Sequence, residues 1–134
     1  MVIENRIIMG EVDSFGGVMY LPNHWVSVVV DFKQLKIFYG DSLGQSMPDR
    51  QLSACECWIG HLTKRSANLP TGRGITHGTL PTGCQKDSVS CGLFAPNAIA
   101  HHYLQHPLLP SDPVTLACRR IEVTLEIIST MTVC

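Results

Sequence analysis

Two residues in the second half of this sequence have the types and spacing of a thiol-based catalytic centre. Cys91 follows a polar turn and stands directly before the apolar run LFAPNAIAHHYL, so its sulfur is expected at the start of a helix. At that position the helix dipole and free backbone N–H groups stabilise a thiolate, and Gly92 would allow close backbone approach to the sulfur. Gln85, six residues upstream, could place an amide donor beside the Cys91 backbone N–H. Paired donors of this kind form an oxyanion hole.

His24 and Asp41 are the candidate base and its orienting carboxylate. The residues from Trp25 to Tyr39 form two alternating runs about a turn near Phe32 and Lys33, which indicates a β-hairpin. If the turn is central, paired residues have numbers that sum to 65, and His24 lies opposite Asp41. A histidine and an aspartate so paired can hydrogen bond, which fixes the imidazole tautomer and supports base catalysis. The alternative is a structural His–Asp pair at a sheet edge.

The hairpin also predicts which side chains face the core. One face is expected to be apolar and buried, and consists of Val26, Val28, Val30, Leu35, Ile37 and Tyr39. The opposite face is expected to be largely solvated, and carries Ser27, Asp31, Gln34 and Lys36.

The remaining elements predict an α+β fold. In chain order they are strands over Val2–Met9 and Gly17–Leu21, an amphipathic helix over Pro48–Lys64, a loop over Ala67–Thr82 with a short strand near Gly74–Leu80, and a helix from Ser90 or Cys91 to about Gln105. A terminal helix follows, with Asp112 as N-cap and Pro113 as its first residue. One face of that helix carries Val114, Ala117, Ile121, Leu125 and Ile128.

Composition limits the classes of function. The 134 residues are enough for one domain, over 1–134, and 45% are apolar while only 16% are charged, which predicts apolar surface that something else covers. A net charge of -1 provides no field to attract nucleic acid or a membrane surface. The N-terminus, MVIENRIIMG, lacks the pattern of a signal peptide. We therefore expect the six cysteines to be reduced thiols in an intracellular protein of the nucleus or cytoplasm.

The joint order of these residues resembles the Ulp/SENP proteases, which process SUMO and related ubiquitin-like proteins. The resemblance extends from about Val18 to the C-terminus, and its spacing is more specific than any one motif. It rests on His24-Trp25, on Tyr39-Gly40-Asp41-Ser42-Leu43, on Gln85 with Cys91-Gly92, and on Arg119-Arg120-Ile121 with Leu125.

The resemblance implies a papain-like cysteine protease fold, with a mixed or antiparallel sheet packed with helices, that hydrolyses the bond after a Gly-Gly tail. The implied roles are Cys91 as nucleophile, His24 as base, Asp41 as orienter and Gln85 as oxyanion donor. Trp25 would bind substrate by partly roofing a narrow channel. The implied partners are a SUMO-like ubiquitin-like protein and its conjugates, and no cofactor is expected.

The sequence departs from the family pattern at three points. Ser90 precedes the nucleophile where the family often has Asp, with Asp87 nearby, and Pro96 follows five residues after Cys91, where it could kink the helix. No Trp precedes Trp25 to form the other wall of the channel. We therefore expect an N-terminally incomplete catalytic domain that is a weak enzyme by itself.

Two alternatives remain open. A catalytically weak remnant could bind a ubiquitin-like protein without cutting it, and an acyltransferase could use the same Cys-His-Asp chemistry. A metal site is suggested by Cys55-x-Cys57 and by the cluster of His101, His102 and His106, but neither has a second ligand pair at the spacing of structural zinc. No metal site is therefore expected.

Overall fold

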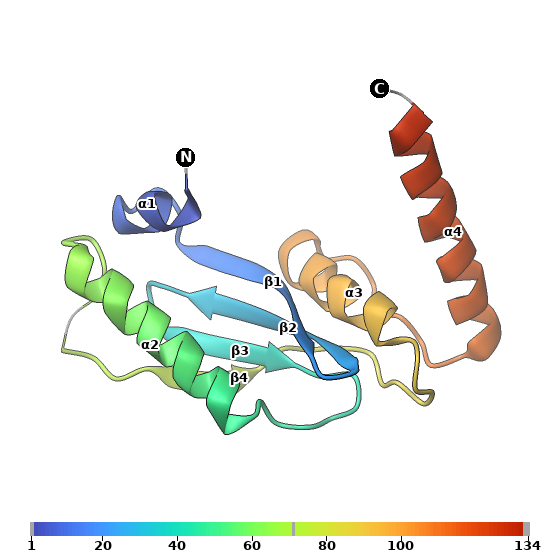
Figure 1. The fold of residues 1–134 in the computed structure, drawn as a ribbon, viewed down its shortest axis with the longest axis horizontal. Coiled ribbons are helices and arrows are strands. Elements are labelled where there is room, and N and C mark those ends of the chain that lie inside the picture. Colours follow the sequence, from blue (N-terminus) through green and yellow to red (C-terminus); the bar gives the residue numbers. More distant parts are fainter. Residues whose placement is uncertain (1, 71, 133–134) are drawn as a thin grey trace.

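The computed structural model describes residues 2–70 and 72–132 as an α+β fold built on a mixed sheet, which confirms the predicted class (Figure 1). Cys134, one of the six cysteines, lies outside the described residues. The elements in chain order are α1 (Ile3–Ile8), β1 (Ser14–Leu21), β2 (His24–Asp31), β3 (Lys36–Gly40), α2 (Asp49–Arg65), β4 (Thr76–Thr79), α3 (Cys91–Leu104) and α4 (Pro113–Thr132). The expected helices over 48–64, 91–105 and beyond Asp112, and the short strand within 74–80, are all confirmed.

The hairpin forms, but its register differs from the prediction by two residues. β1, β2 and β3 run antiparallel, and β4 joins β3 in parallel. Val30 pairs with Ile37 where the prediction paired it with Leu35. The turn is wider than expected because the Asp31 carboxylate accepts hydrogen bonds from the backbone N–H groups of Lys33 and Gln34. A shift of two residues keeps every side chain on its predicted face, whereas a shift of one would reverse them all.

β2 is covered on both faces, so the prediction of one largely solvated face is wrong for Ser27, whereas Gln34 is exposed and Asp31 and Lys36 are half-buried. One face packs against α1 and α2, where Val30 and Ile37 meet Ile59 and Leu62. On the other face, Ser27 and Val29 are fully buried under α3. The helix between Cys91 and Leu104 covers this second face (Figure 1). The alternation of residues in β2 gives no information on whether a helix packs there.

The first segment is a helix, where a strand over Val2–Met9 was expected. Its isoleucines favour a strand by propensity, but Ile3 and Ile7 also lie one helical turn apart and pack into the core beside α2. The Trp58 indole N–H donates to the Glu4 carboxylate, 3.0 Å away, and ties α1 to α2. Tertiary packing therefore overrides the local preference of these β-branched residues.

α4 begins as predicted and then extends away from the sheet (Figure 1). The Asp112 carboxylate accepts a hydrogen bond of 2.8 Å from the Thr115 backbone N–H, which confirms the N-cap. Leu116 is buried, but the face formed by Val114, Ile121, Leu125 and Ile128 is exposed. None of the helices in the described residues is both long enough and apolar enough to span a membrane.

Candidate active site

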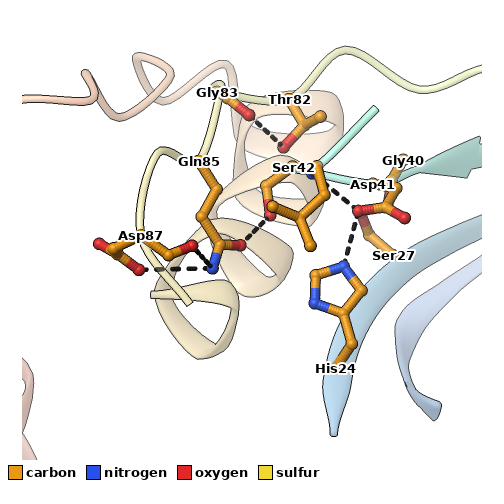
Figure 2. Close-up of polar contacts among 10 residues, drawn as sticks. His24, Ser27, Gly40, Asp41, Ser42, Thr82, Gly83, Gln85 and Asp87 are labelled. Carbon is orange, nitrogen blue, oxygen red and sulfur yellow. Dashed lines mark hydrogen bonds and ion pairs between the residues drawn. The ribbon is translucent and has the colours of Figure 1, made fainter. Parts of the chain in front are cut away.

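His24 and Asp41 form a direct hydrogen bond, as the hairpin predicted, although the register differs. His24 begins β2 and Asp41 immediately follows β3, and the imidazole Nε2 lies 2.6 Å from the carboxylate Oδ1 (Figure 2). In the observed register they are diagonal neighbours, a separation that long side chains can bridge. The same Oδ1 accepts a bond from the Leu43 N–H at 2.8 Å, which fixes the carboxylate within its turn. Because Nε2 engages Asp41, Nδ1 is the nitrogen that could receive a thiol proton.

Gln85 is held beside this pair by the next residue of the same turn. The Ser42 hydroxyl donates to the Gln85 amide oxygen at 2.6 Å, and the Gln85 backbone N–H donates to the Ser42 carbonyl at 2.7 Å. Both side chains are buried. Consecutive residues, Asp41 and Ser42, therefore hold the candidate base and the candidate oxyanion donor, as Figure 2 shows.

The Gln85 amide nitrogen is turned toward its own loop. It donates to the Asp87 carbonyl at 2.8 Å, and the Asp87 carboxylate lies 3.4 Å away. This amide group carries two donor hydrogens, so it can serve a reacting oxygen if it gives up the longer bond, to the Asp87 carboxylate.

Cys91 is the first residue of α3, as predicted, and its side chain is buried, with 7% of the residue exposed. Ser90 is the N-cap residue, and its carbonyl accepts the first backbone hydrogen bonds of the helix, from the N–H groups of Leu93 and Phe94. The first N–H groups of any helix have no partner within it, so they remain available to an anion. Pro96 lies inside α3, which nevertheless continues to Leu104.

The structure does not join all four predicted residues by hydrogen bonds. Among the residues it describes, the Cys91 thiol makes no hydrogen bond to His24, Asp41 or Gln85. Catalytic hydrogen bonds are often long without substrate and shorten in the reacting complex. At Gly92, an added Cβ would meet no other described atom within 4 Å beyond its neighbours in the helix, so the space beside the first turn of α3 is open.

Trp25, the predicted substrate-binding residue, lies at the surface with 41% of its area exposed. Its ring packs against that of Tyr20 in a tilted arrangement, with centroids 4.9 Å apart, and the two residues are paired across β1 and β2. Sequence reasoning did not single out Tyr20, although cross-strand aromatic pairs are a common feature of sheets.

A cleft of about 390 Å³ is lined by Asp41 together with residues of β3, β4 and the loop that precedes α2. Tyr39 lines it, and its buried hydroxyl has no hydrogen-bond partner among the described residues. Burial, with a smaller contribution from the Asp41 charge, raises the pKa of Tyr39 to about 12. Tyr39 is therefore a neutral neighbour of the candidate orienting carboxylate.

The other described cysteines have different environments. Burial, together with Glu56, raises the pKa of the Cys55 thiol, which disfavours its thiolate. Cys57, Cys84 and Cys118 are exposed. Within residues 2–70 and 72–132, no three His, Cys, Asp or Glu side chains gather as a metal site would require.

Three residues of the site were not assigned a role from sequence. Ser42 was noticed only as part of the segment YGDSL, Asp87 only as a neighbour of Ser90, and Arg120 only as part of the last helix. In the structure all three belong to one hydrogen-bonded network around Gln85 and Ser90. Side chains that act through a loop have no periodic pattern that would reveal them.

Comparisons with known proteins bear on the fold and the family of the chain. No curated protein matches the chain in sequence. Among solved structures, the SUMO protease Ulp1 with its catalytic cysteine oxidised to a sulfenic acid matches with a TM-score of 0.62 and 17% identity, covering 85% of this chain and 52% of that one. The C-terminal Ulp1 protease domain in complex with Smt3, the yeast ortholog of SUMO, matches with a TM-score of 0.54 and 19% identity, covering 81% and 49%.

These structural likenesses show a shared fold, and the chain spans about half the length of the solved chains. The family model for the Ulp1 protease family, C-terminal catalytic domain, matches residues 17–121. That range includes His24, Asp41, Gln85 and Cys91. The chain therefore belongs to the Ulp1 protease family.

Proposed function

We propose that this chain is a cysteine peptidase that cleaves after the Gly-Gly tail of a SUMO-like ubiquitin-like protein, both in precursors and in conjugates. The observation that carries the proposal is the turn after β3, where Asp41 holds His24 and Ser42 holds Gln85. Six residues after Gln85, Cys91 begins α3. Membership of the Ulp1 protease family and the Smt3 complex of a solved relative support the choice of partner.

The reaction begins with transfer of the thiol proton of Cys91 to His24 Nδ1, while Asp41 stabilises the imidazolium. The thiolate attacks the carbonyl carbon of the terminal Gly, and the oxyanion accepts bonds from the Cys91 N–H and the Gln85 amide. The imidazolium then protonates the departing amine, leaving a thioester on Cys91. Water, deprotonated by His24, hydrolyses the thioester and restores the thiol.

Covalent trapping tests this proposal directly. The chain is mixed with SUMO-like and other ubiquitin-like proteins whose C-terminal Gly carries an electrophile, and the adduct is mapped by mass spectrometry. We expect an adduct at Cys91 with at least one SUMO-like probe, and none with a matched probe that lacks the two glycines. The Cys91→Ser variant should form no adduct. Modification of the exposed Cys84 instead, or of no cysteine with any probe, would refute the proposal.

A binding-only role is the second candidate, and two features of the site favour it. In the described part of the chain, the Cys91 thiol makes no hydrogen bond to His24, and the Gln85 amide donates within its own loop. A binding protein would retain the same affinity for the modifier when Cys91 is replaced by Ser, and would form no covalent adduct. Calorimetry on both forms, beside the trapping experiment, separates the two roles.

A further inference from the structure

The loop between Gln85 and Cys91 is organised around the carboxylate of Asp87. One oxygen, Oδ1, accepts hydrogen bonds from the backbone N–H groups of Val89 and Ser90, at 2.8 and 2.7 Å. The other, Oδ2, accepts from the Ser90 hydroxyl at 2.6 Å. These bonds, the one from the Ser90 hydroxyl foremost, lower the pKa of Asp87 to about 2. The carboxylate is therefore charged throughout the neutral pH range.

The side chain of Arg120, on α4, reaches this loop. Arg120 donates a hydrogen bond to the Ser90 hydroxyl, and its guanidinium lies 3.9 Å from Asp87 Oδ2. Arg119, its neighbour, points elsewhere and pairs with Glu122 at 3.2 Å on α4 itself. An exposed ion pair alone contributes little, but Ser90 is fully buried and directly precedes Cys91. The contact of Arg120 with Ser90 is thus the one with consequences for the site.

The same loop determines how the Gln85 side chain is oriented. Its amide oxygen is held by Ser42 from the strand side, and its amide nitrogen is held by the Asp87 carbonyl from the loop side (Figure 2). If the loop moves, the second anchor of the amide moves with it. The start of α3 moves as well, because Ser90 is its N-cap.

We propose that Arg120, Asp87 and Ser90 are positioning residues that fix the Gln85 amide and the first residue of α3 for the reaction, so that α4 controls the reacting groups without contacting them. This inference rests on the proposed function for its kinetic consequences only. A misplacement of about 1 Å at a reacting centre can cost roughly a hundredfold in rate. Loss of this control should therefore reduce kcat. KM should stay nearly unchanged, because the variants do not alter the surface of this chain that binds the modifier.

The matched pair Arg120→Gln and Arg119→Gln tests the proposal on the full chain. Both variants remove one charge from the same turn of α4, but only the first removes a contact with Ser90. We expect Arg120→Gln to lower kcat about ten- to hundredfold and Arg119→Gln to leave it unchanged. Arg120→Lys keeps the charge and a donor, and should recover most of the loss. Equal kcat values for Arg120→Gln and Arg119→Gln would overturn the proposal.

A double-mutant cycle separates positioning from a general loss of stability. Asp87→Asn can still accept the two backbone bonds but can no longer accept from the Ser90 hydroxyl at Oδ2. If the three residues act as one unit, Asp87→Asn should lower kcat much less in the Arg120→Gln background than alone. If the losses of kcat from the two substitutions are simply additive, the three residues do not act as one unit. Rates are measured below the melting temperature of each variant, so that unfolding contributes to none of them.

Two measurements without substrate keep this test independent of the proposed function. Hydrogen exchange at the Val89 and Ser90 amides should be faster in Arg120→Gln than in Arg119→Gln, because Asp87 holds both. The rate of alkylation of Cys91 should change in Arg120→Gln and stay the same in Arg119→Gln. If no modifier is cleaved but both changes occur, the positioning holds and the proposed function fails. If neither changes, the positioning fails whatever the substrate.

Discussion

The two sides of the candidate site are held by different kinds of contact. His24 and Asp41 lie at the ends of paired strands, where a backbone ladder determines their separation. Gln85 and Cys91 flank an irregular loop whose shape depends on the side chain of Asp87 and on Arg120 from α4. On the strand side, the predicted register was wrong by two residues, yet His24 was still placed near Asp41 because each side chain kept its predicted face of the sheet. On the loop side, no repeating pattern could correct such an error, because each hydrogen bond involves a particular side chain.

The largest expected effect is on the strand side, at Asp41. Asp41→Asn keeps an oxygen for the Leu43 N–H but no longer stabilises the imidazolium or its correct tautomer. We expect kcat on a matched modifier to fall by up to about 10⁴-fold, with the melting temperature nearly unchanged. Steady-state kinetics and calorimetry check this. Unfolding of the variant, or unchanged turnover, would mean that the His–Asp pair is only structural.

On the loop side, the most damaging small change is expected at Gly83. An added Cβ would lie 2.4 Å from the Leu109 carbonyl oxygen and 2.5 Å from the Phe94 ring. Gly83→Ala should therefore displace the loop that carries Gln85, lowering stability by about 1–3 kcal/mol, as overpacking does, and reducing kcat. Gly60→Ala is the control, because its Cβ would meet nothing within 4 Å and alanine favours a helix. Equal stability of both variants in urea unfolding would contradict the close packing at Gly83.

The next effect is expected where the two sides meet, at Ser42. Ser42→Ala leaves the buried Gln85 amide oxygen without its donor, which costs about 1–3 kcal/mol and frees the amide to rotate. Ser27 is the matched control, since it is also buried but donates to the Gly40 carbonyl within the sheet. Ser27→Ala should destabilise to a similar degree while kcat stays close to that of the wild type. If both variants lose kcat equally, Ser42 has no special link to Gln85.

The smallest effect is expected on the exposed face of α4. Leu125 is 57% exposed, so Leu125→Glu should change the free energy of unfolding by less than about 0.5 kcal/mol. Leu116→Ala, at a residue only 2% exposed on the same helix, should cost about 2–5 kcal/mol. Chemical denaturation of both variants measures the difference. A large loss at Leu125 would show that this face is covered in solution.

The sequence was informative wherever a regular pattern repeated. Alternation in β2 and β3 placed His24 near Asp41, and the polar turn before an apolar run placed Cys91 at a helix start. It failed for residues 2–9, where Ile7 packs as part of a helix despite its strand preference. The partners of Gln85 were also missed, because a contact between Arg120 and Ser90 across 30 positions depends on tertiary packing alone.

Selective alkylation decides whether Cys91 reacts as a thiolate activated by His24. At pH 6 an ordinary thiol with a pKa of about 8.5 is less than about 1% ionised. Brief iodoacetamide treatment should therefore label Cys91 first, although it is buried and Cys57, Cys84 and Cys118 are exposed. His24→Ala should abolish this preference. Faster labelling of the exposed cysteines in the wild-type chain would contradict the account.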